Sequence, residues 1–245
     1  MKVPSPYSGG IILSYQCNLS CIHCLYNCRG DWKDWISIDK FEEILKILEK
    51  TSSFVSLHLT GGEPFINFPL LLESVKLCKN YGIPFFVETN CYWAKNEKIA
   101  EEKLRKLKEN GLNSIMLSYS IFYLEKVPLE NFEIDMKKSF EIFGMENVTF
   151  YTMSGYKILK ESGIKGNMKF EDSLKIIGEK KFLNFLRNYI VPKGKCLYTL
   201  ENWFLKFKAE KFKGANCIAE FLNPYHIHID LYGNYIASFC SGITL

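Results

Sequence analysis

The sequence lacks an apolar run long enough to cross a membrane, because no uninterrupted apolar stretch approaches the roughly 18 residues that a spanning helix needs. Its start, residues 1–6, has no apolar signal core either. We therefore expect a cytoplasmic protein that is neither secreted nor embedded in a membrane. Neither sign of charge dominates, since 31 basic residues stand against 27 acidic ones and leave a net charge of +4. This balance is too mild to predict a nucleic-acid partner, and no RNA-binding module is visible.

Because no secretion signal is present, the nine cysteines are not expected to form a disulfide framework. In a reducing compartment, a tight cysteine cluster is more typical of metal binding or redox chemistry. Low-complexity segments are missing as well, and 47% of the 245 residues are hydrophobic, so a disordered or fibrous chain is excluded. The length favours one large α/β domain.

Short β-rich runs alternate with amphipathic segments from residue 8 to about 153. Strand, helix and strand recur at intervals of roughly 30 residues, which predicts right-handed βαβ units and a parallel sheet. In such sheets and barrels, functional residues follow the carboxyl ends of the strands. The expected strands cover residues 10–15, 54–59, 83–88, 114–118 and 148–152, and the expected helices lie around 41–48, 67–81, 99–110 and 133–142.

The pattern becomes less regular after residue 155. Residues 180–214 carry nine Lys or Arg against two Glu, interleaved with aromatic residues. Two interpretations are open: helices with a solvated basic face and an aromatic core face, or a docking surface for an acidic or peptide partner. Residues 225–239 alternate like a β-hairpin that turns at Gly233-Asn234. His226 and His228 would then face the same side of one strand, where a core or surface role is favoured over metal ligation.

Three cysteines stand close together directly after the first expected strand: Cys17, Cys21 and Cys24, with Cys28 four residues further on. Soft thiolate ligands suit an iron–sulfur cluster or zinc. The spacing differs from that of a zinc ribbon, which uses two separated C-x2-C pairs. Three ligands to a four-iron cluster would leave one iron open to a small molecule.

This C-x3-C-x2-C arrangement resembles the signature of the radical S-adenosylmethionine (radical SAM) enzymes. The resemblance continues at Thr60-Gly61-Gly62-Glu63-Pro64, which follows the second expected strand and is similar to the GGEP element of that family. Glu88-Thr89-Asn90 ends the third expected strand and Ser118 ends the fourth, where relatives contact the ribose and the methionyl carboxylate of the cofactor. Together these matches cover roughly residues 8 to 155.

The resemblance implies a partial TIM-like (β/α)6 barrel with mainly parallel strands and a short C-terminal β-hairpin extension. Residues 1–155 would form the radical SAM core, and residues 156–245 the end of the barrel plus a truncated extension. It also implies the chemistry: Cys17, Cys21 and Cys24 would bind a [4Fe-4S] cluster that chelates S-adenosylmethionine. Reduction would split the cofactor into methionine and a 5′-deoxyadenosyl radical, which abstracts a substrate hydrogen. A flavodoxin- or ferredoxin-type protein would supply the electron.

The same resemblance implies a set of cofactor-binding residues. The Glu63 carboxylate would hold the methionine ammonium group, and the two glycines before it would let the backbone approach closely. His23 stands where many relatives carry an aromatic residue beside the adenine. The full expected set is Gly61, Gly62, Glu63, Pro64, Glu88, Asn90, Ser118 and His23.

Other cysteines leave alternatives open. Cys28 could be a substrate-facing thiol or hydrogen-atom donor, or a plain loop cysteine. Cys91, where many relatives have glycine, is a candidate for a catalytic or substrate role, whereas Cys78 is expected to pack in the core.

The C-terminal part, from Cys217 through residues 228–234 to Cys240, is similar to the start of the SPASM or twitch extensions of peptide-modifying radical SAM enzymes. Cys196, Cys217 and Cys240 could therefore bind a single auxiliary iron–sulfur cluster, although three isolated thiols are the favoured interpretation. Only five residues follow Cys240 and none is a cysteine, so a complete two-cluster extension is not expected.

The substrate stays open at this stage. A peptide or protein substrate fits the SPASM-like ending and the basic aromatic segment. A small metabolite fits the compact size, and an activase of glycyl-radical enzymes is a third alternative. A different class would be a non-catalytic zinc or iron–sulfur module whose cysteines are structural, but such a module has no use for Gly61-Gly62-Glu63-Pro64.

Overall fold

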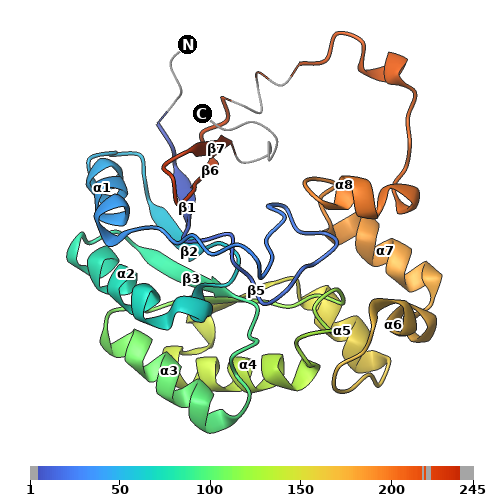
Figure 1. Ribbon diagram of the computed structural model, residues 1–245, viewed down its shortest axis with the longest axis horizontal. Coiled ribbons are helices and arrows are strands. Elements are labelled where there is room, and N and C mark those ends of the chain that lie inside the picture. Colours follow the sequence, from blue (N-terminus) through green and yellow to red (C-terminus); the bar gives the residue numbers. More distant parts are fainter. Residues whose placement is uncertain (1–4, 217, 219–221, 238–245) are drawn as a thin grey trace.

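The computed structural model describes residues 5–216, 218 and 222–237. Seven strands form one sheet in the order β5-β4-β3-β2-β1-β6-β7, with every neighbouring pair parallel except the last (Figure 1). This is the α/β architecture of a partial TIM-like barrel, as expected. The strands are β1 (Ser8–Ile12), β2 (Ser56–Thr60), β3 (Phe85–Thr89), β4 (Ile115–Ser118), β5 (Val148–Tyr151), β6 (His226–Ile229) and β7 (Tyr235–Ala237).

The helices that join the first five strands pack on the outer face of the sheet (Figure 1). Their apolar residues recur at helical spacing, as in the first of them, where Phe41, Ile44, Leu45 and Leu48 are all buried. These helices are α1 (Ile38–Glu49), α2 (Phe68–Asn80), α3 (Glu97–Glu109) and α4 (Leu129–Phe143).

Side-chain caps define where three of these helices begin. Ser37 accepts a hydrogen bond from the Lys40 amide, and Asn67 and Asn96 do the same at the starts of α2 and α3. Each cap satisfies an amide that has no partner within its helix. Helix α4 begins at Leu129, four residues earlier than the expected segment, and Pro128 precedes it without a side-chain cap. Proline fixes the backbone just before the first turn, so the helix begins there without the polar cap residue that marks the other starts.

The less regular part after β5 is mostly helical. It comprises α5 (Met153–Glu161), α6 (Phe170–Ile177), α7 (Glu179–Tyr189) and the short α8 (Cys196–Thr199). In the basic aromatic segment, α7 fits the first interpretation, and docking of a partner stays a prediction. In α7, Phe182 and Phe185 are buried, whereas Phe207 and Phe212 further along expose more than half of their surface.

The last two strands form the expected hairpin, with Gly233 at a φ of 90° in the turn. Its first strand pairs in parallel with β1, so that Gly10 lies between His58 of β2 and His228 of β6. The C-terminal end of the described chain thus returns to the N-terminal strand (Figure 1). Among the described residues, no helix has the length and apolar character needed to cross a membrane.

Candidate active site

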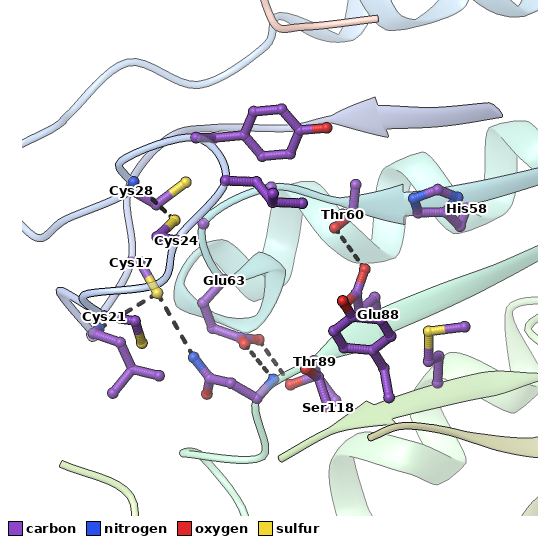
Figure 2. Close-up of a pocket in the computed structure, with 18 of the residues that line it drawn as sticks. Cys17, Cys21, Cys24, Cys28, His58, Thr60, Glu63, Glu88, Thr89 and Ser118 are labelled. Atoms are coloured by element: carbon purple, nitrogen blue, oxygen red, sulfur yellow. Dashed lines mark hydrogen bonds between the residues drawn. The ribbon is translucent and has the colours of Figure 1, made fainter. Parts of the chain in front are cut away.

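A cavity of about 370 Å³ opens on the inner side of the sheet, at and below the carboxyl ends of its strands. All three cysteines of the motif line it, together with residues of β2, β3 and β4. Figure 2 shows that the labelled side chains of the cysteine loop and those of the strand ends point toward the same space. The expected site residues that line the cavity are Cys17, Cys21, Cys24, Cys28, His23, Gly61, Gly62, Glu63, Glu88, Asn90 and Ser118.

The cysteines lie on the loop that follows β1. The Leu19 amide approaches the Cys17 sulfur at 3.4 Å, and the Cys28 amide approaches the Cys24 sulfur at 3.3 Å. These amides place partial positive charge next to two of the three predicted ligands, which favours the thiolate form that binds metal. The loop is thereby shaped so that the sulfur atoms converge rather than point into solvent.

The thiols of this loop differ in acidity. A hydrogen bond from Cys28, supported by nearby backbone amides, lowers the pKa of Cys24 to about 6. Burial raises the pKa of Cys17 to about 12 and raises that of Cys21 as well. The Cys28 thiol, which donates to Cys24, has a raised pKa. Cys24 is therefore the thiolate of the group near neutral pH, and a bound cation would be needed to hold Cys17 and Cys21 in that state.

The two glycines after β2 pack directly against the start of the cysteine loop. The Gly62 amide donates to the Ser14 carbonyl at 2.7 Å, and the Glu63 amide donates to the Gln16 carbonyl at 2.9 Å. A Cβ at Gly62 would lie 1.8 Å from the Gln16 oxygen and 2.9 Å from the Cys17 nitrogen. Only glycine allows this approach, so the requirement for glycine here is to seat the loop that carries Cys17.

Glu63 joins the ends of two strands. One oxygen of its carboxylate accepts from the Phe65 amide at 3.1 Å and from the Thr89 hydroxyl at 2.8 Å, and the other accepts from the Asn90 amide at 2.7 Å. Burial raises the pKa of Glu63 to about 8 in spite of these three donors. A cationic group in the cavity would favour its ionised form. Pro64 begins a short 3-10 turn beside it and does not line the cavity.

The remaining predicted cofactor residues occupy the cavity wall. Glu88 accepts from the Thr60 hydroxyl at 3.0 Å, and burial raises its pKa. The side-chain nitrogen Nδ2 of Asn90 lies 3.7 Å from the Cys17 sulfur, so this residue connects the end of β3 to the cysteine loop. The Ser118 hydroxyl lies 3.0 Å from that of Tyr123.

His23 presents a flat, neutral ring to the cavity. It stacks on Phe122 with ring centroids 4.4 Å apart, and burial lowers its pKa to about 4. Its Nδ1 is buried with no hydrogen-bond partner among the described residues. An unpaired buried nitrogen is costly, so a ligand that pairs with it or stacks on the ring would be favoured.

Cys91 lies apart from the residues that line the cavity. It has a φ of 64° and is fully buried, next to the Asp135 carboxyl of α4. The catalytic or substrate role predicted for it stays a prediction, which this placement does not support. Burial raises the pKa of Asp135 to about 7, against hydrogen bonds from Cys91 and Ser139.

Replacing Asp135 with asparagine should change how stability depends on pH. Because the folded-state pKa is raised, the contribution of a protonated Asp135 is fully present below its unfolded pKa near 4 and is lost as the pH rises through about 7. The free energy of unfolding of the native sequence, relative to that of Asp135→Asn, should fall by about 2 kcal/mol between pH 5 and pH 8. Urea denaturation of both proteins at the two pH values measures this difference, and parallel pH profiles would contradict it.

Of the three cysteines predicted for an auxiliary cluster, Cys217 and Cys240 lie outside the described residues. Cys196 is buried at the start of α8, where its sulfur accepts from the Lys193 amide at 3.1 Å and donates to the Lys193 carbonyl at 2.9 Å. It is thus bound within its own turn. The auxiliary cluster stays a prediction.

The segment around Cys196 also contacts the cysteine loop. The Lys195 amide donates to the Cys24 carbonyl at 3.0 Å, and the Thr199 hydroxyl donates to the Ile22 carbonyl. Gly194, at a φ of 57°, lies so close that a Cβ would be 2.2 Å from the Leu25 carbonyl oxygen. Ile190 and Val191 from this segment line the cavity.

Sequence reasoning missed several residues of the cavity wall. Tyr26, Tyr123 and Tyr151 come from loops or strand ends where aromatic residues are common, and nothing in their spacing marks them. His58 could not be predicted, because its contact with His228 joins residues 170 positions apart and depends on β6 lying beside β1. The sequence signal that indicates this histidine cluster is the spacing of His226 and His228, which places both side chains on one face of a strand.

Comparison with known proteins decides the family. The model described as "Radical SAM superfamily" matches residues 11–169, which include the cysteine loop and Glu63. The chain belongs to the radical SAM superfamily. Members of this superfamily in general use S-adenosylmethionine and a [4Fe-4S] cluster.

The curated proteins to which this chain is similar differ in what their names describe. A putative peptide biosynthesis protein, YydG of Bacillus subtilis, is 26% identical over 110 residues, which are 45% of this chain and 34% of YydG. A GTP 3′,8-cyclase of Clostridium perfringens is 32% identical over 113 residues, which are 44% of this chain and 32% of the cyclase. The matched segments thus cover about a third of the length of these relatives.

Among solved structures, BtrN in complex with AdoMet and 2-DOIA has a similar fold. The superposition has a TM-score of 0.53 at 13% identity and covers 97% of this chain and 75% of BtrN. At that identity the likeness concerns the fold alone.

Proposed function

We propose that this chain is a radical SAM enzyme that splits S-adenosylmethionine reductively and uses the resulting 5′-deoxyadenosyl radical to abstract a hydrogen atom from a substrate. The observation that carries the proposal is the convergence of Cys17, Cys21 and Cys24 on the same cavity as Glu63 and Glu88. A purely structural metal site would have no use for buried carboxylates on the wall of an open cavity.

The residues present fit the cluster and the cofactor. We assign Cys17, Cys21 and Cys24 as cluster ligands, and the closeness of Gly62 to the Cys17 backbone fixes the loop that carries them. Glu63 would hold the methionine ammonium group, with Glu88, Asn90 and Ser118 beside it. His23, whose Nδ1 has no partner, would lie against the adenine. When bound, the cluster supplies the electron that cleaves the cofactor.

The chain's own residues would orient the cofactor and keep water away from it. Glu63 is held by three donors, so its carboxylate is fixed before any ligand arrives. Apolar and aromatic side chains surround the polar groups, including Phe86, Met116 and Ile190. Such a lining excludes water, which is the condition for protecting a reactive species.

We propose a peptide or protein as the first substrate class. Exposed apolar side chains follow the cavity-lining segment at residues 190–191, and Tyr198, Leu205 and Phe207 are each more than half exposed. An extended chain could lie on such side chains before entering the cavity. The name of YydG agrees with this choice.

A small molecule is the second candidate. The similarity to GTP 3′,8-cyclase favours it, because that name describes a reaction of a small molecule. Under either candidate we propose a flavodoxin- or ferredoxin-type electron donor and a cytoplasmic location.

The test is anaerobic reconstitution of the protein with iron and sulfide, followed by reduction in the presence of S-adenosylmethionine. We expect about four irons per chain and formation of 5′-deoxyadenosine. Close to eight irons would support an auxiliary cluster that includes Cys196. A chain that binds zinc and no iron after this treatment would instead support the non-catalytic alternative, in which Cys28 acts as a fourth ligand.

A further inference from the structure

Three of the four histidines of the chain meet on the inner face of the sheet. His58 comes from β2, and His226 and His228 come from β6, on the two sides of β1. One ligand nitrogen from each lies within 4.8 Å of the other two. We call these three residues the histidine trio. All of them line the cavity, and Figure 2 shows His58 on the far side of Thr60 and Glu88 from the four cysteines.

Gly10 makes this meeting possible. It lies on β1 between His58 and His228, and a Cβ at this position would be 2.4 Å from His58 Nε2 and 2.7 Å from His228 Cδ2. Any other residue would fill the space in which the two rings meet. The sequence therefore leaves a hollow on β1, which is filled by imidazoles from the two neighbouring strands.

The hydrogen bonds of His226 leave one of its nitrogens ready to act as a ligand. Its Nδ1 lies 2.9 Å from the Ser8 hydroxyl, which donates its own hydrogen to the Tyr225 carbonyl at 2.8 Å. Ser8 must then accept from His226, which places the proton on Nδ1. Nε2 of His226 is left with a free lone pair, the arrangement that is usual for a metal-ligating histidine.

His58 and His228 share one hydrogen bond, which leaves another nitrogen of His228 without a partner among the described residues. Their Nε2 atoms lie 3.1 Å apart, so one ring must donate to the other. The other nitrogen of His228, Nδ1, is buried and has no hydrogen-bond partner among the described residues. A cation between the two Nε2 atoms would take a lone pair from each, once the donating ring carries its proton on Nδ1 instead.

We propose that the histidine trio binds a divalent transition metal of the zinc type, separate from the cysteine loop. Three nitrogen ligands about 2.0 Å from a tetrahedral metal lie about 3.3 Å apart, so small ring rotations would bring the three nitrogens to this spacing. Because the trio lines the cavity, the remaining coordination position faces it. That position would take an oxygen or nitrogen donor from water or from a molecule held in the cavity.

The electrostatics of the trio agree with neutral ligands rather than charged residues. Burial lowers the pKa of His228 to about 3, and it lowers the pKa of His58 and of His226 as well. The rings are therefore uncharged at neutral pH, and a metal would not have to displace a proton from an imidazolium.

The experiment uses the full chain with its cluster reconstituted, so that the cysteine loop is filled, and equilibrium dialysis against Zn²⁺ under anaerobic conditions. We expect about one zinc per chain in addition to the iron. X-ray absorption at the zinc edge should show only nitrogen or oxygen ligands at about 2.0 Å, without the sulfur shell at about 2.3 Å that cysteines would give. A sulfur shell, or no retained zinc, would overturn the proposal.

Two variants test the ligands and the hollow. His228→Ala should weaken zinc binding at least 100-fold, and Gly10→Ala should weaken it without removing any ligand. Gly9→Ala is the matched control, because its Cβ would contact Ile227 instead of the trio. Iron content and thermal unfolding, measured on each variant, identify those that fail to fold. Retention of zinc by His228→Ala, or equal loss in both glycine variants when all are folded, would contradict the assignment.

Discussion

Replacing Cys24 with alanine is expected to reduce 5′-deoxyadenosine formation at least about 100-fold, because a three-ligand cluster cannot survive the loss of one ligand. Cys24 is the cysteine of the loop with the lowered pKa, and the Cys28 amide and thiol both contact its sulfur. Its removal takes away the thiolate on which we expect the cluster to assemble. Iron content, the absorption of the reconstituted protein and the yield of 5′-deoxyadenosine measure the effect.

Cys78→Ala is the matched control for this variant. Cys78 is fully buried in α2 and does not line the cavity. The Cys78→Ala protein should be slightly less stable, because the substitution leaves a small cavity, but it should keep its iron and its activity. A second variant, Cys28→Ala, distinguishes three cysteine ligands from four. It should retain the cluster if only Cys17, Cys21 and Cys24 bind it. Full activity in Cys24→Ala would refute the assignment of the ligands.

Glu63→Gln is expected to weaken S-adenosylmethionine binding about 10- to 100-fold while leaving the iron content near that of the native protein. The loss corresponds to one charge-assisted hydrogen bond to an ammonium group, worth about 1.5–3 kcal/mol. In addition, the side-chain NH2 group of the glutamine would replace one accepting oxygen. It would then face a hydrogen-bond donor from Phe65, Thr89 or Asn90. Equilibrium binding of the cofactor to the reconstituted protein gives the affinity.

The contribution of the Glu63 charge to cofactor affinity must be separated from that of the hydrogen bonds that hold Glu63 at the strand ends. Thr89→Val removes the hydroxyl that donates to Glu63 and accepts from the Trp93 indole, and it leaves the carboxylate in place. We expect a lower thermal midpoint but a cofactor affinity within about tenfold of the native value. If Thr89→Val lost affinity as strongly as Glu63→Gln, Glu63 would be a positioning residue rather than a cofactor ligand.

Much of the first half of the molecule follows from local sequence signals. The starts of α1, α2 and α3 are marked by Ser37, Asn67 and Asn96, whose side chains bind the first free amides. The strands alternate with these helices at regular spacing, so the parallel sheet and the place of the cysteine loop could be predicted. The position of Glu63 at a strand end follows from the same rule.

Other features depend on contacts between distant segments. The hairpin was predicted, but its pairing with β1 was not, because parallel pairing across more than 200 residues leaves no local pattern. The histidine trio depends on that pairing, and on a glycine whose role is visible only when both neighbouring strands are in place. The burial of Cys91 against Asp135 likewise depends on how α4 contacts the loop that follows β3, as in the hydrogen bond from Asn131 to the Tyr92 carbonyl.

The segment around Gly194 shows that the N-terminal part of the fold depends on contacts with later residues. The family match ends at residue 169, yet residues 190–199 pack on the cysteine loop, and β6 occupies the edge of β1. A chain cut at the end of the family match would leave an unpaired strand edge and an uncovered ligand loop, both of which favour aggregation. We therefore expect that residues 11–169 alone would be less stable than the whole chain, because residues 190–199 and β6 both complete contacts made by the N-terminal part.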